Sequence, residues 1–340
     1  MPSGPGVFFA GDALFIRLRL LGDIVFTIPA VQLFRERYPG TRLHYVVEER
    51  FQEMAELIPG VDRVLTVPRR RGIAEILDFR RQVRALGIGL VVDLHSGPGS
   101  ALLAWASGAP LRVGYRTPNR NWAYHRLVER FAHTRPAHSV YNQARLLEAV
   151  GVDARSVPAY PPIAPRLLHS SPRLDSLREL RPKIVIHLGA GNRFRDWGED
   201  HFSELVKRLE SEKIHALLFG SSPEEAARAA RLGGSPFVHD LSGPLSVSEL
   251  LSLISMADAY VGADSGPLHL ASLTATPLVA LYGPNRSEVS GPWRTQAVAI
   301  VELEMECRPC SQRSCKYGTI ACMRNISTDR VYEAVIPFIH

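Results

Sequence analysis

The stretch from Asp258 to Pro284, DAYVGADSGPLHLASLTATPLVALYGP, constrains the fold more than any other part of the chain. A short apolar strand is expected at Ala259–Val261, and a helix follows over Pro267–Leu273. A second apolar strand is expected at Leu278–Tyr282. Strand, helix and strand in this order predict a βαβ unit of a parallel sheet.

The turn between the first strand and the helix is Asp264-Ser265-Gly266. Asp264 or Ser265 is suited to cap the helix, and Pro267 suits its first turn. Unpaired backbone N–H groups and the helix dipole attract anions at such a place, and a diphosphate is the anion we expect there. The alternative is that Asp and Ser only cap the helix, as in any α/β protein, and the turn by itself favours that alternative.

The same alternation runs through the chain in two series, separated by a proline-rich segment at 158–182. In the first series, strands are expected at 13–18, 43–47, 63–67, 90–94 and 112–115, and helices from 27 to about 38 and at 51–57, 73–86, 101–106 and 141–150. In the second series, strands are expected at 183–188, 216–219 and 237–240, and helices at 200–209, 224–232, 247–256 and 328–339. Alternating β and α segments predict open parallel sheets with helices on both faces, whose ligands lie at the carboxyl ends of the strands.

Charge is distributed unevenly along the 340 residues, whose net charge is +6. Residues 1–182 carry 25 Lys and Arg, all of them Arg, against 16 Asp and Glu, whereas residues 183–340 carry 15 against 18. A basic first half predicts an anionic partner: a phosphorylated acceptor, a membrane surface or nucleic acid. Nucleic acid is disfavoured because no binding motif or basic run interleaved with aromatic residues is present.

The segment near the N-terminus is expected to be neither a membrane span nor a signal peptide. Arg17, Arg19 and Asp23 interrupt its apolar residues, and Asp12 lies inside the one candidate apolar region. We therefore expect a protein of the cytoplasm.

Polar residues follow two of the strands expected in the first half. Gly22-Asp23 follows the first strand on an expected loop, Arg19–Asp23, where a carboxylate could take a proton from a bound hydroxyl group. Capping of the next helix is at least as good an explanation for Asp23. His95 follows a later strand and could contact a substrate, although a loop histidine with local partners is the more common case.

In the second half, the small-residue turn Gly189-Ala190-Gly191 is followed by Arg193 and Arg195. Such a turn lets the backbone approach a phosphate, and the arginines could neutralise a leaving diphosphate. The turn is not GxGxxG, and the chain contains neither GxxxxGK[ST] nor Asp-x-Asp, so we expect no metal and no dinucleotide cofactor. Glu224 or Glu225 and His269 complete a cluster of polar groups at strand ends.

All four cysteines lie in one short segment near the C-terminus, with the spacing C-x₂-C-x₄-C-x₆-C. They are Cys307, Cys310, Cys315 and Cys322. Four thiolates could hold a tetrahedral zinc ion, but this is not the spacing of a common zinc finger. A reduced cysteine-rich loop is the slightly favoured alternative.

Three segments resemble the heptosyltransferases of glycosyltransferase family nine: IRLRLLGDIVFTIPAV at 16–31, HLGAGNRFRDW at 187–197 and GADSGPLHLA at 262–271. Residues 93–115 and the cysteine-rich end are also similar to the family. The resemblance implies an α/β protein of the GT-B fold, with two Rossmann-like domains whose parallel sheets face each other across a cleft. It implies an acceptor-binding domain at 1–160, a linker at 161–182, a nucleotide-sugar-binding domain at 183–325, and a C-terminal helix at 326–340 packing back on the first domain.

The resemblance also implies a reaction: metal-independent, inverting transfer of a heptose from ADP-heptose to the lipopolysaccharide inner core. Asp23 matches the general base of the family. The implied donor-binding residues are Gly189, Ala190, Gly191, Arg195, Glu225, Asp264, Ser265, Gly266 and His269. The candidate acceptor-binding residues are Arg19, Gly22, His95, Arg116 and Arg120. The implied acceptor is anionic lipid A carrying Kdo, with peripheral contact to the inner membrane.

Two other functions remain open from the sequence. One is a different GT-B sugar-nucleotide enzyme, such as an epimerase or a transferase with another donor sugar. The other is a non-catalytic protein that binds lipopolysaccharide or a sugar nucleotide.

Overall fold

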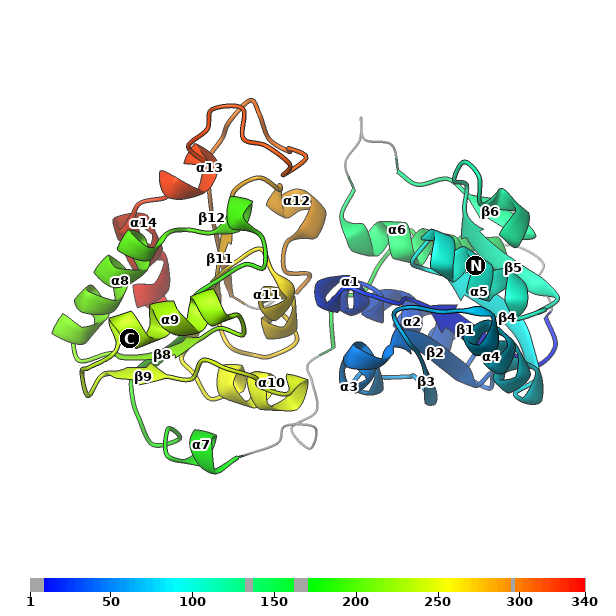
Figure 1. The fold of residues 1–340 in the computed structure, drawn as a ribbon, viewed down its shortest axis with the longest axis horizontal. Helices are drawn as coiled ribbons and strands as arrows, with labels where there is room; N and C mark the ends of the chain where they lie inside the picture. Colours follow the sequence, from blue (N-terminus) through cyan, green and yellow to red (C-terminus); the bar gives the residue numbers. More distant parts are fainter. Residues whose placement is uncertain (1–8, 132–136, 162–170, 295–296, 340) are drawn as a thin grey trace. The chain divides into compact units, whose positions relative to one another are not determined.

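The computed structural model describes residues 9–131, 137–161, 171–294 and 297–339. The chain forms two units, Met1–Tyr160 and Pro161–His340, each with one six-stranded sheet (Figure 1). Residues 162–170 of the expected linker lie outside the described residues. Within the described ranges, none of the helices combines the length and apolar character needed to cross a bilayer.

The sheet of the first unit is parallel throughout, in the order β3-β2-β1-β4-β5-β6. Its strands are β1 (Asp12–Ile16), β2 (Leu43–Glu48), β3 (Arg63–Val67), β4 (Ile88–Asp93), β5 (Leu111–Tyr115) and β6 (Arg126–Val128). The helices are α1 (Leu21–Val25), α2 (Ile28–Arg37), α3 (Gln52–Glu56), α4 (Ile73–Ala85), α5 (Pro98–Ala106) and α6 (Ser139–Arg145), with short 3₁₀ turns η1 (Glu49–Phe51), η2 (Asn121–Ala123) and η3 (Leu146–Val150).

Successive side chains of β1 point to opposite faces of this sheet. Leu14 and Ile16 pack in one core with Phe79 of α4 and Ala104 of α5. Phe15 points to the other face, where its ring meets Phe34 of α2 at 5.2 Å between centroids. Helices α4 and α5 therefore cover one face, and α2 covers the other.

The second unit repeats this plan with the order β12-β11-β10-β7-β8-β9. Its strands are β7 (Lys183–His187), β8 (His215–Phe219), β9 (Val238–Asp240), β10 (Ala259–Ala263), β11 (Leu278–Tyr282) and β12 (Val298–Glu302). The helices are α7 (Pro172–Asp175), α8 (Glu199–Ser211), α9 (Pro223–Leu232), α10 (Val247–Ser255), α11 (Gly266–Ala271), α12 (Ser287–Ser290), α13 (Ala321–Arg324) and α14 (Thr328–Val335), with 3₁₀ turns η5 (Arg193–Arg195) and η6 (Ile336–Phe338). In both units the first and fourth strands of the unit lie side by side, and chain order reverses there. Open α/β sheets bind their ligands at such a switch point.

Three features differ from the sequence expectations. Gly22 and Asp23 do not lie on a loop but in α1, a helix of five residues that is too short to show a periodic pattern. Strands β6 and β12 were not expected, because β6 has only three residues and β12 is half-exposed at a sheet edge. The helix expected from residue 27 begins at Ile28, and the hydroxyl of Thr27 donates to the carbonyl of Ile24 without capping the helix.

The expected C-terminal helix is α14. Its buried residues Val331, Tyr332 and Val335 pack in the core of the second unit, and Thr328 donates to Glu204 of α8 at 2.7 Å. Packing on the first unit, as the resemblance implies, would have to use the opposite, polar side of α14, and it stays a prediction.

Candidate functional site

The first unit gathers charged side chains where β1 and β4 end. Arg17 follows β1 and donates through Nη1 to the carbonyl of Leu94, after β4, at 2.6 Å. Its Nη2 lies 2.6 Å from Oδ2 of Asp23. The backbone N–H of Leu20 is 3.4 Å from the same oxygen. We call Arg17, Arg19, Asp23, His95 and Arg120 the β1–β4 edge.

Asp23 is the acidic member of this edge, and its side chain is 38% exposed. Both contacts described for its carboxylate use Oδ2. Within the described part of the chain, Oδ1 therefore has no protein partner and is open to a ligand. The side chain of Arg17 is only 9% exposed, and its ion pair with Asp23 fixes the orientation of the carboxylate.

His95 lies in the same electrostatic environment. Burial lowers the pKa of His95, and the positive charges of Arg17 and Arg19 lower it further, to about 4, although the Asp23 carboxylate acts in the opposite direction. The imidazole is therefore neutral near pH 7. A neutral histidine can accept or donate one hydrogen bond to a hydroxyl group of a ligand.

Of the other residues expected here, Arg120 joins the edge and Arg116 does not. Arg120 donates through Nη1 to the carbonyl of Ser96 at 2.7 Å. Arg116 is exposed and pairs with Glu129, after β6. Gly22 is buried in the first turn of α1.

The second unit has a hydrogen-bonded ring of polar side chains after β7 and β10. Asn285 donates through Nδ2 to Oδ2 of Asp264 at 2.6 Å and accepts from Nε2 of Gln312 at 2.7 Å. Oε1 of Gln312 accepts from Nε of Arg195 at 2.8 Å and from Nδ2 of Asn192 at 2.8 Å. We call these five residues the β7–β10 network.

Arg195 closes the ring on Asp264. Its Nη1 donates to the backbone carbonyl of Asp264 at 3.1 Å and lies 3.3 Å from the carboxylate Oδ2. Burial raises the pKa of Asp264, but the hydrogen bond from His269 and the charge of Arg195 outweigh it, so that the pKa is lowered. Asp264 is therefore an anion near pH 7, held by a cation on one side and by polar groups on the others.

Ser265 and Glu225 make a second set of contacts beside the network. Ser265 does not cap α11 but lies with Oγ 3.3 Å from Nδ1 of His187, a buried histidine whose ring stacks on Phe219. Burial lowers the pKa of His187 to about 4. Oε2 of Glu225 accepts from the backbone N–H groups of Ser221 and Ser222 at 2.7 and 3.0 Å, so its carboxylate caps α9.

The turn after β7 lies against Glu225. A Cβ atom on Gly189 would lie 1.6 Å from Oε1 of Glu225, so only glycine fits. Gly191 has φ +63°, a left-handed backbone conformation that glycine adopts readily because it has no Cβ atom. Ala190 is half-buried against the core, and Gly266 is the first residue of α11.

Replacing Gly189 by alanine is expected to lower the free energy of unfolding by about 1–3 kcal/mol, because the added methyl group overpacks against a fixed carboxylate. Denaturant titration measures this loss. Gly40→Ala is the matched control, since a Cβ there meets nothing within 4 Å. The loss should shrink when Glu225 is also replaced by alanine. A loss from Gly189→Ala no larger than that from Gly40→Ala would contradict the close approach.

Sequence reasoning missed Arg17, Asn285 and Gln312. Arg17 lies within an apolar run that is typical of a strand, and Gln312 lies in the cysteine-rich segment, 117 residues from Arg195. No local pattern links such distant residues. His187 is the last residue of β7 and could have been found by its position at a strand end.

The cysteine-rich segment contains free thiols, of which Cys322 is buried and the other three are half-buried. Burial raises the pKa of Cys322, and the nearby Cys307, Cys310 and Cys315 raise it further. Among the residues that the structure describes, no three His, Cys, Asp or Glu side chains are grouped so that they could hold a metal ion.

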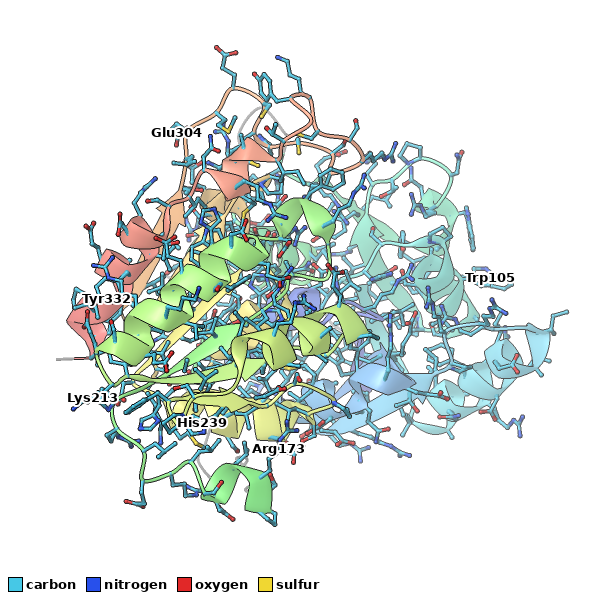
Figure 2. All side chains as sticks on the ribbon, turned by 60° about the vertical axis from the view of Figure 1, so that its left-hand side comes forward. Trp105, Arg173, Lys213, His239, Glu304 and Tyr332 are labelled. Carbon is cyan, nitrogen blue, oxygen red and sulfur yellow. The ribbon has the colours of Figure 1, made fainter. Side chains whose placement is uncertain are left out.

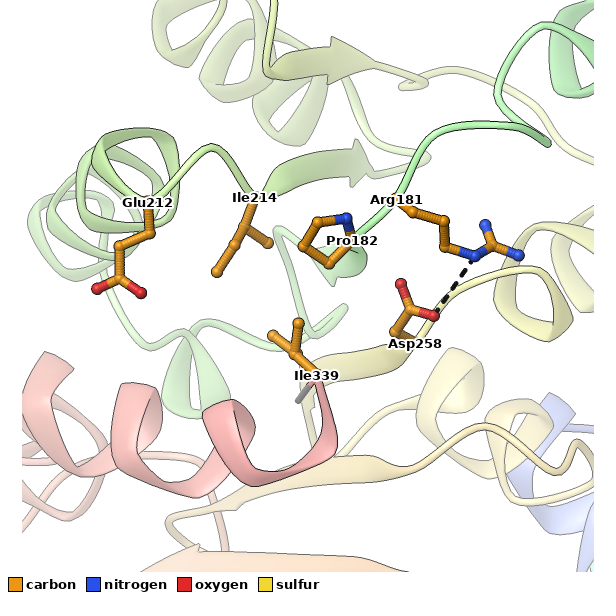
Figure 3. A pocket seen from close by; sticks show the side chains of 6 residues that line it. All are labelled: Arg181, Pro182, Glu212, Ile214, Asp258 and Ile339. Carbon is orange, nitrogen blue, oxygen red and sulfur yellow. Dashed lines mark ion pairs between the residues drawn. The ribbon is translucent and has the colours of Figure 1, made fainter.

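One pocket of the second unit lies at the opposite ends of the strands, with a volume of about 460 Å³ (Figure 3). Arg181 and Asp258 form an ion pair of 3.7 Å on its wall. The remaining lining residues are Pro182, Glu212, Ile214 and Ile339. These residues precede or flank the amino ends of the strands, and none of the expected site residues is among them.

Comparison with known proteins identifies the family. Residues 76–321, more than half of the chain, match the model of glycosyltransferase family 9 (heptosyltransferase). The chain belongs to this family. It is a glycosyltransferase, as the sequence predicted.

Relatives of this family 9 enzyme support the assignment. It is 26% identical over 322 residues to lipopolysaccharide heptosyltransferase 1 of Pseudomonas aeruginosa, covering 89% of this chain and 87% of the relative. A solved family 9 glycosyltransferase from Veillonella parvula has a TM-score of 0.84 at 20% identity and covers 97% of both chains. ADP-heptose lps heptosyltransferase II of E. coli has a TM-score of 0.76 at 21% identity, covering 96% of this chain and 98% of that one. The expected GT-B fold with two Rossmann-like units is confirmed.

Proposed function

We propose that this glycosyltransferase moves a heptose from ADP-heptose to the inner core of lipopolysaccharide, with inversion and without a metal ion. The names of its relatives support the sugar and the acceptor class. Two solved structures of one E. coli heptosyltransferase of the same fold, WaaC, contain ADP and ADP-2-deoxy-2-fluoro heptose, which supports the donor.

In this proposal the second unit binds the donor. Arg195 neutralises the diphosphate, and the backbone of the Gly189-Ala190-Gly191 turn approaches it, since a turn without bulky side chains lets N–H groups reach phosphate oxygens. Asp264, Ser265, Gly266 and His269 shape the other side, and Glu225 holds the first turn of α9 in place. Arg195 is oriented by Gln312 and Asp264, so its guanidinium is positioned before the donor arrives.

Asp23 is the proposed general base. The observation that supports this role is that the protein contacts only one oxygen of the carboxylate. Nη2 of Arg17 lies 2.6 Å from Oδ2, and Oδ1 has no partner among the described residues. An oriented carboxylate oxygen of this kind can accept the proton of an attacking hydroxyl group. The departing diphosphate is stabilised by arginine, so no metal ion is needed for charge neutralisation.

The first unit is the proposed acceptor-binding unit. Arg19, Arg120 and neutral His95 share the β1–β4 edge with Asp23. The guanidinium groups of the two arginines suit the carboxylates and phosphates of lipid A carrying Kdo. Gly22, buried next to Asp23 in the first turn of α1, has no side chain that would crowd the base. Arg116 is exposed, and an acceptor anion could replace Glu129 in its ion pair. A lipid acceptor places the enzyme at the cytoplasmic surface of the inner membrane, as a peripheral protein.

The test is a transfer assay with the full chain, ADP-heptose and a Kdo–lipid A acceptor. Mass spectrometry should show one added heptose, NMR should show the inverted anomeric configuration, and EDTA should leave the rate unchanged. UDP- and GDP-sugars serve as control donors. Transfer from one of these in preference to ADP-heptose would keep the glycosyltransferase and overturn the donor, and loss of activity in EDTA would overturn metal independence.

A further inference from the structure

Helix α4 exposes an unusual face. Phe79 and Val83 are buried in the core, whereas Ile73 and Leu77 are 79% and 56% exposed. At about 100° per residue, positions 73, 77, 80 and 84 fall on one stripe of the helix. The stripe therefore begins with two bare aliphatic side chains and continues with Arg80 and Arg84.

The neighbouring helix α5 adds two exposed indole rings. Trp105, in the last turn of α5, and Trp122, in η2, are 49% and 56% exposed and meet edge to face at 6.1 Å between centroids. The indole N–H of Trp122 donates to the carbonyl of Asn119 at 3.0 Å, so its polar end is satisfied and its apolar body faces outward. Figure 2 shows Trp105 projecting away from the ribbon.

Positive charge accompanies these apolar side chains. Residues 69–84 carry six arginines against Glu75 and Asp78, a net charge of +4. Arg81 pairs with Asp78 at 3.4 Å, but neither Arg80 nor Arg84 has an ion pair within the described ranges. We call Ile73, Leu77, Arg80, Arg84, Trp105 and Trp122 the α4–α5 face, since both helices cover the same side of the sheet.

We propose that the α4–α5 face binds the surface of an anionic lipid bilayer. Exposed tryptophan and aliphatic side chains that are accompanied by arginines match the boundary between headgroups and acyl chains. The unpaired arginines match the negative potential of anionic lipids. A protein partner would instead favour a continuous apolar centre with charges at its rim.

The location of the face fits the proposed function, on which this inference rests. Helices α4 and α5 begin where the strands of the sheet end, so the first turn of α4 and the β1–β4 edge lie at the same edge of the sheet. Gly99 in the first turn of α5 lies near Arg71, and Arg19 acts electrostatically on the same arginine. The end of the α4–α5 face that carries Ile73 and Leu77 therefore lies at the same edge of the sheet as the residues proposed to bind the lipid acceptor.

The experiment is co-sedimentation of the full chain with phosphatidylcholine vesicles, with and without phosphatidylglycerol. Binding should need the anionic lipid, weaken with salt, and fall at least tenfold in the double variants Ile73→Ser/Leu77→Ser and Arg80→Ala/Arg84→Ala. The charge control is Arg37→Ala/Arg155→Ala, because both arginines are exposed elsewhere on the first unit. Ile300→Ser is the apolar control, since Ile300 is 38% exposed on β12. Equal binding by face variants and controls, or equal binding to neutral vesicles, would overturn the proposal.

Two further readouts separate docking from folding and from transfer. Vesicles should shift the tryptophan emission of the wild-type chain to shorter wavelength, and Trp105→Phe/Trp122→Phe should lose this shift; a shift that persists would overturn the role of the indoles. The face variants should transfer heptose to a lipid-free core oligosaccharide at the wild-type rate. If the wild-type chain binds anionic vesicles but transfers no heptose, the proposed function fails and the docking face stands. If face variants of unchanged melting temperature lose transfer to the lipid-free acceptor, the face acts in catalysis and the docking proposal fails.

Discussion

Replacing Asp23 by asparagine is expected to lower kcat by about 10²–10⁴-fold, the range for loss of a general base. The amide oxygen can still accept from Arg17, so the first turn of α1 and the orientation of the side chain should be kept. Because Asp23 lies in the first unit and the proposed donor site in the second, ADP should bind the variant as tightly as the wild-type chain. Steady-state transfer kinetics and calorimetry of ADP binding measure the two quantities.

The matched control for this change is Asp153→Asn. Asp153 is an exposed carboxylate of the same unit that pairs with Arg155 at 2.6 Å, so its loss removes one surface charge and one arginine contact. Wild-type turnover in Asp23→Asn would exclude Asp23 as the base. A parallel loss in the control would attribute the effect to net charge.

Replacing Asp264 by alanine is expected to be the most damaging single change in the second unit. It removes the anion that holds Arg195 and His269 and leaves Asn285 without an acceptor. Loss of one partner from a buried ion pair costs about 3–5 kcal/mol of stability. ADP binding should fall together with stability, because Arg195 loses the contact that orients it.

Stability and binding can be distinguished with Asp258→Ala. Asp258 also pairs with an arginine and accepts from the backbone N–H of Lys183, but it lies at the amino ends of the same strands. This control should lose stability and keep its affinity for ADP, as measured by calorimetry below the unfolding temperature. If Asp264→Ala retains wild-type affinity for ADP, the β7–β10 network is structural and does not position the donor.

Most of the fold could be predicted because its elements are local. Ten strands were expected close to their observed positions, since each is a short apolar run bounded by a turn, such as Leu278–Tyr282. Strands β6 and β12 were missed because they form by pairing with a neighbouring strand. The local sequence does not encode this pairing. Helix α1 was missed because five residues, Leu21–Val25, show no period.

The candidate sites were predictable only in part. His95 and Asp264, shortly after strands, and Asp23, in the first helix after β1, could be found because the topology of a parallel sheet brings strand ends together. Their partners could not. Asn285 reaches Asp264, and Gln312 reaches Arg195, through the folding of distant segments, and Arg17 is hidden in an apolar run.

The identical strand order of the two sheets has a consequence for how such enzymes diversify. Each half carries its polar groups at its own switch point, after β1 and β4 in one half and after β7 and β10 in the other, and each half has a separate core. Mutations that reshape the loops of one half therefore need no compensating change in the sheet of the other. Selection can therefore alter the half that we propose to bind the acceptor while the half that we propose to bind the donor stays unchanged, and an exchange of residues 9–160 between relatives would make such a change in one step.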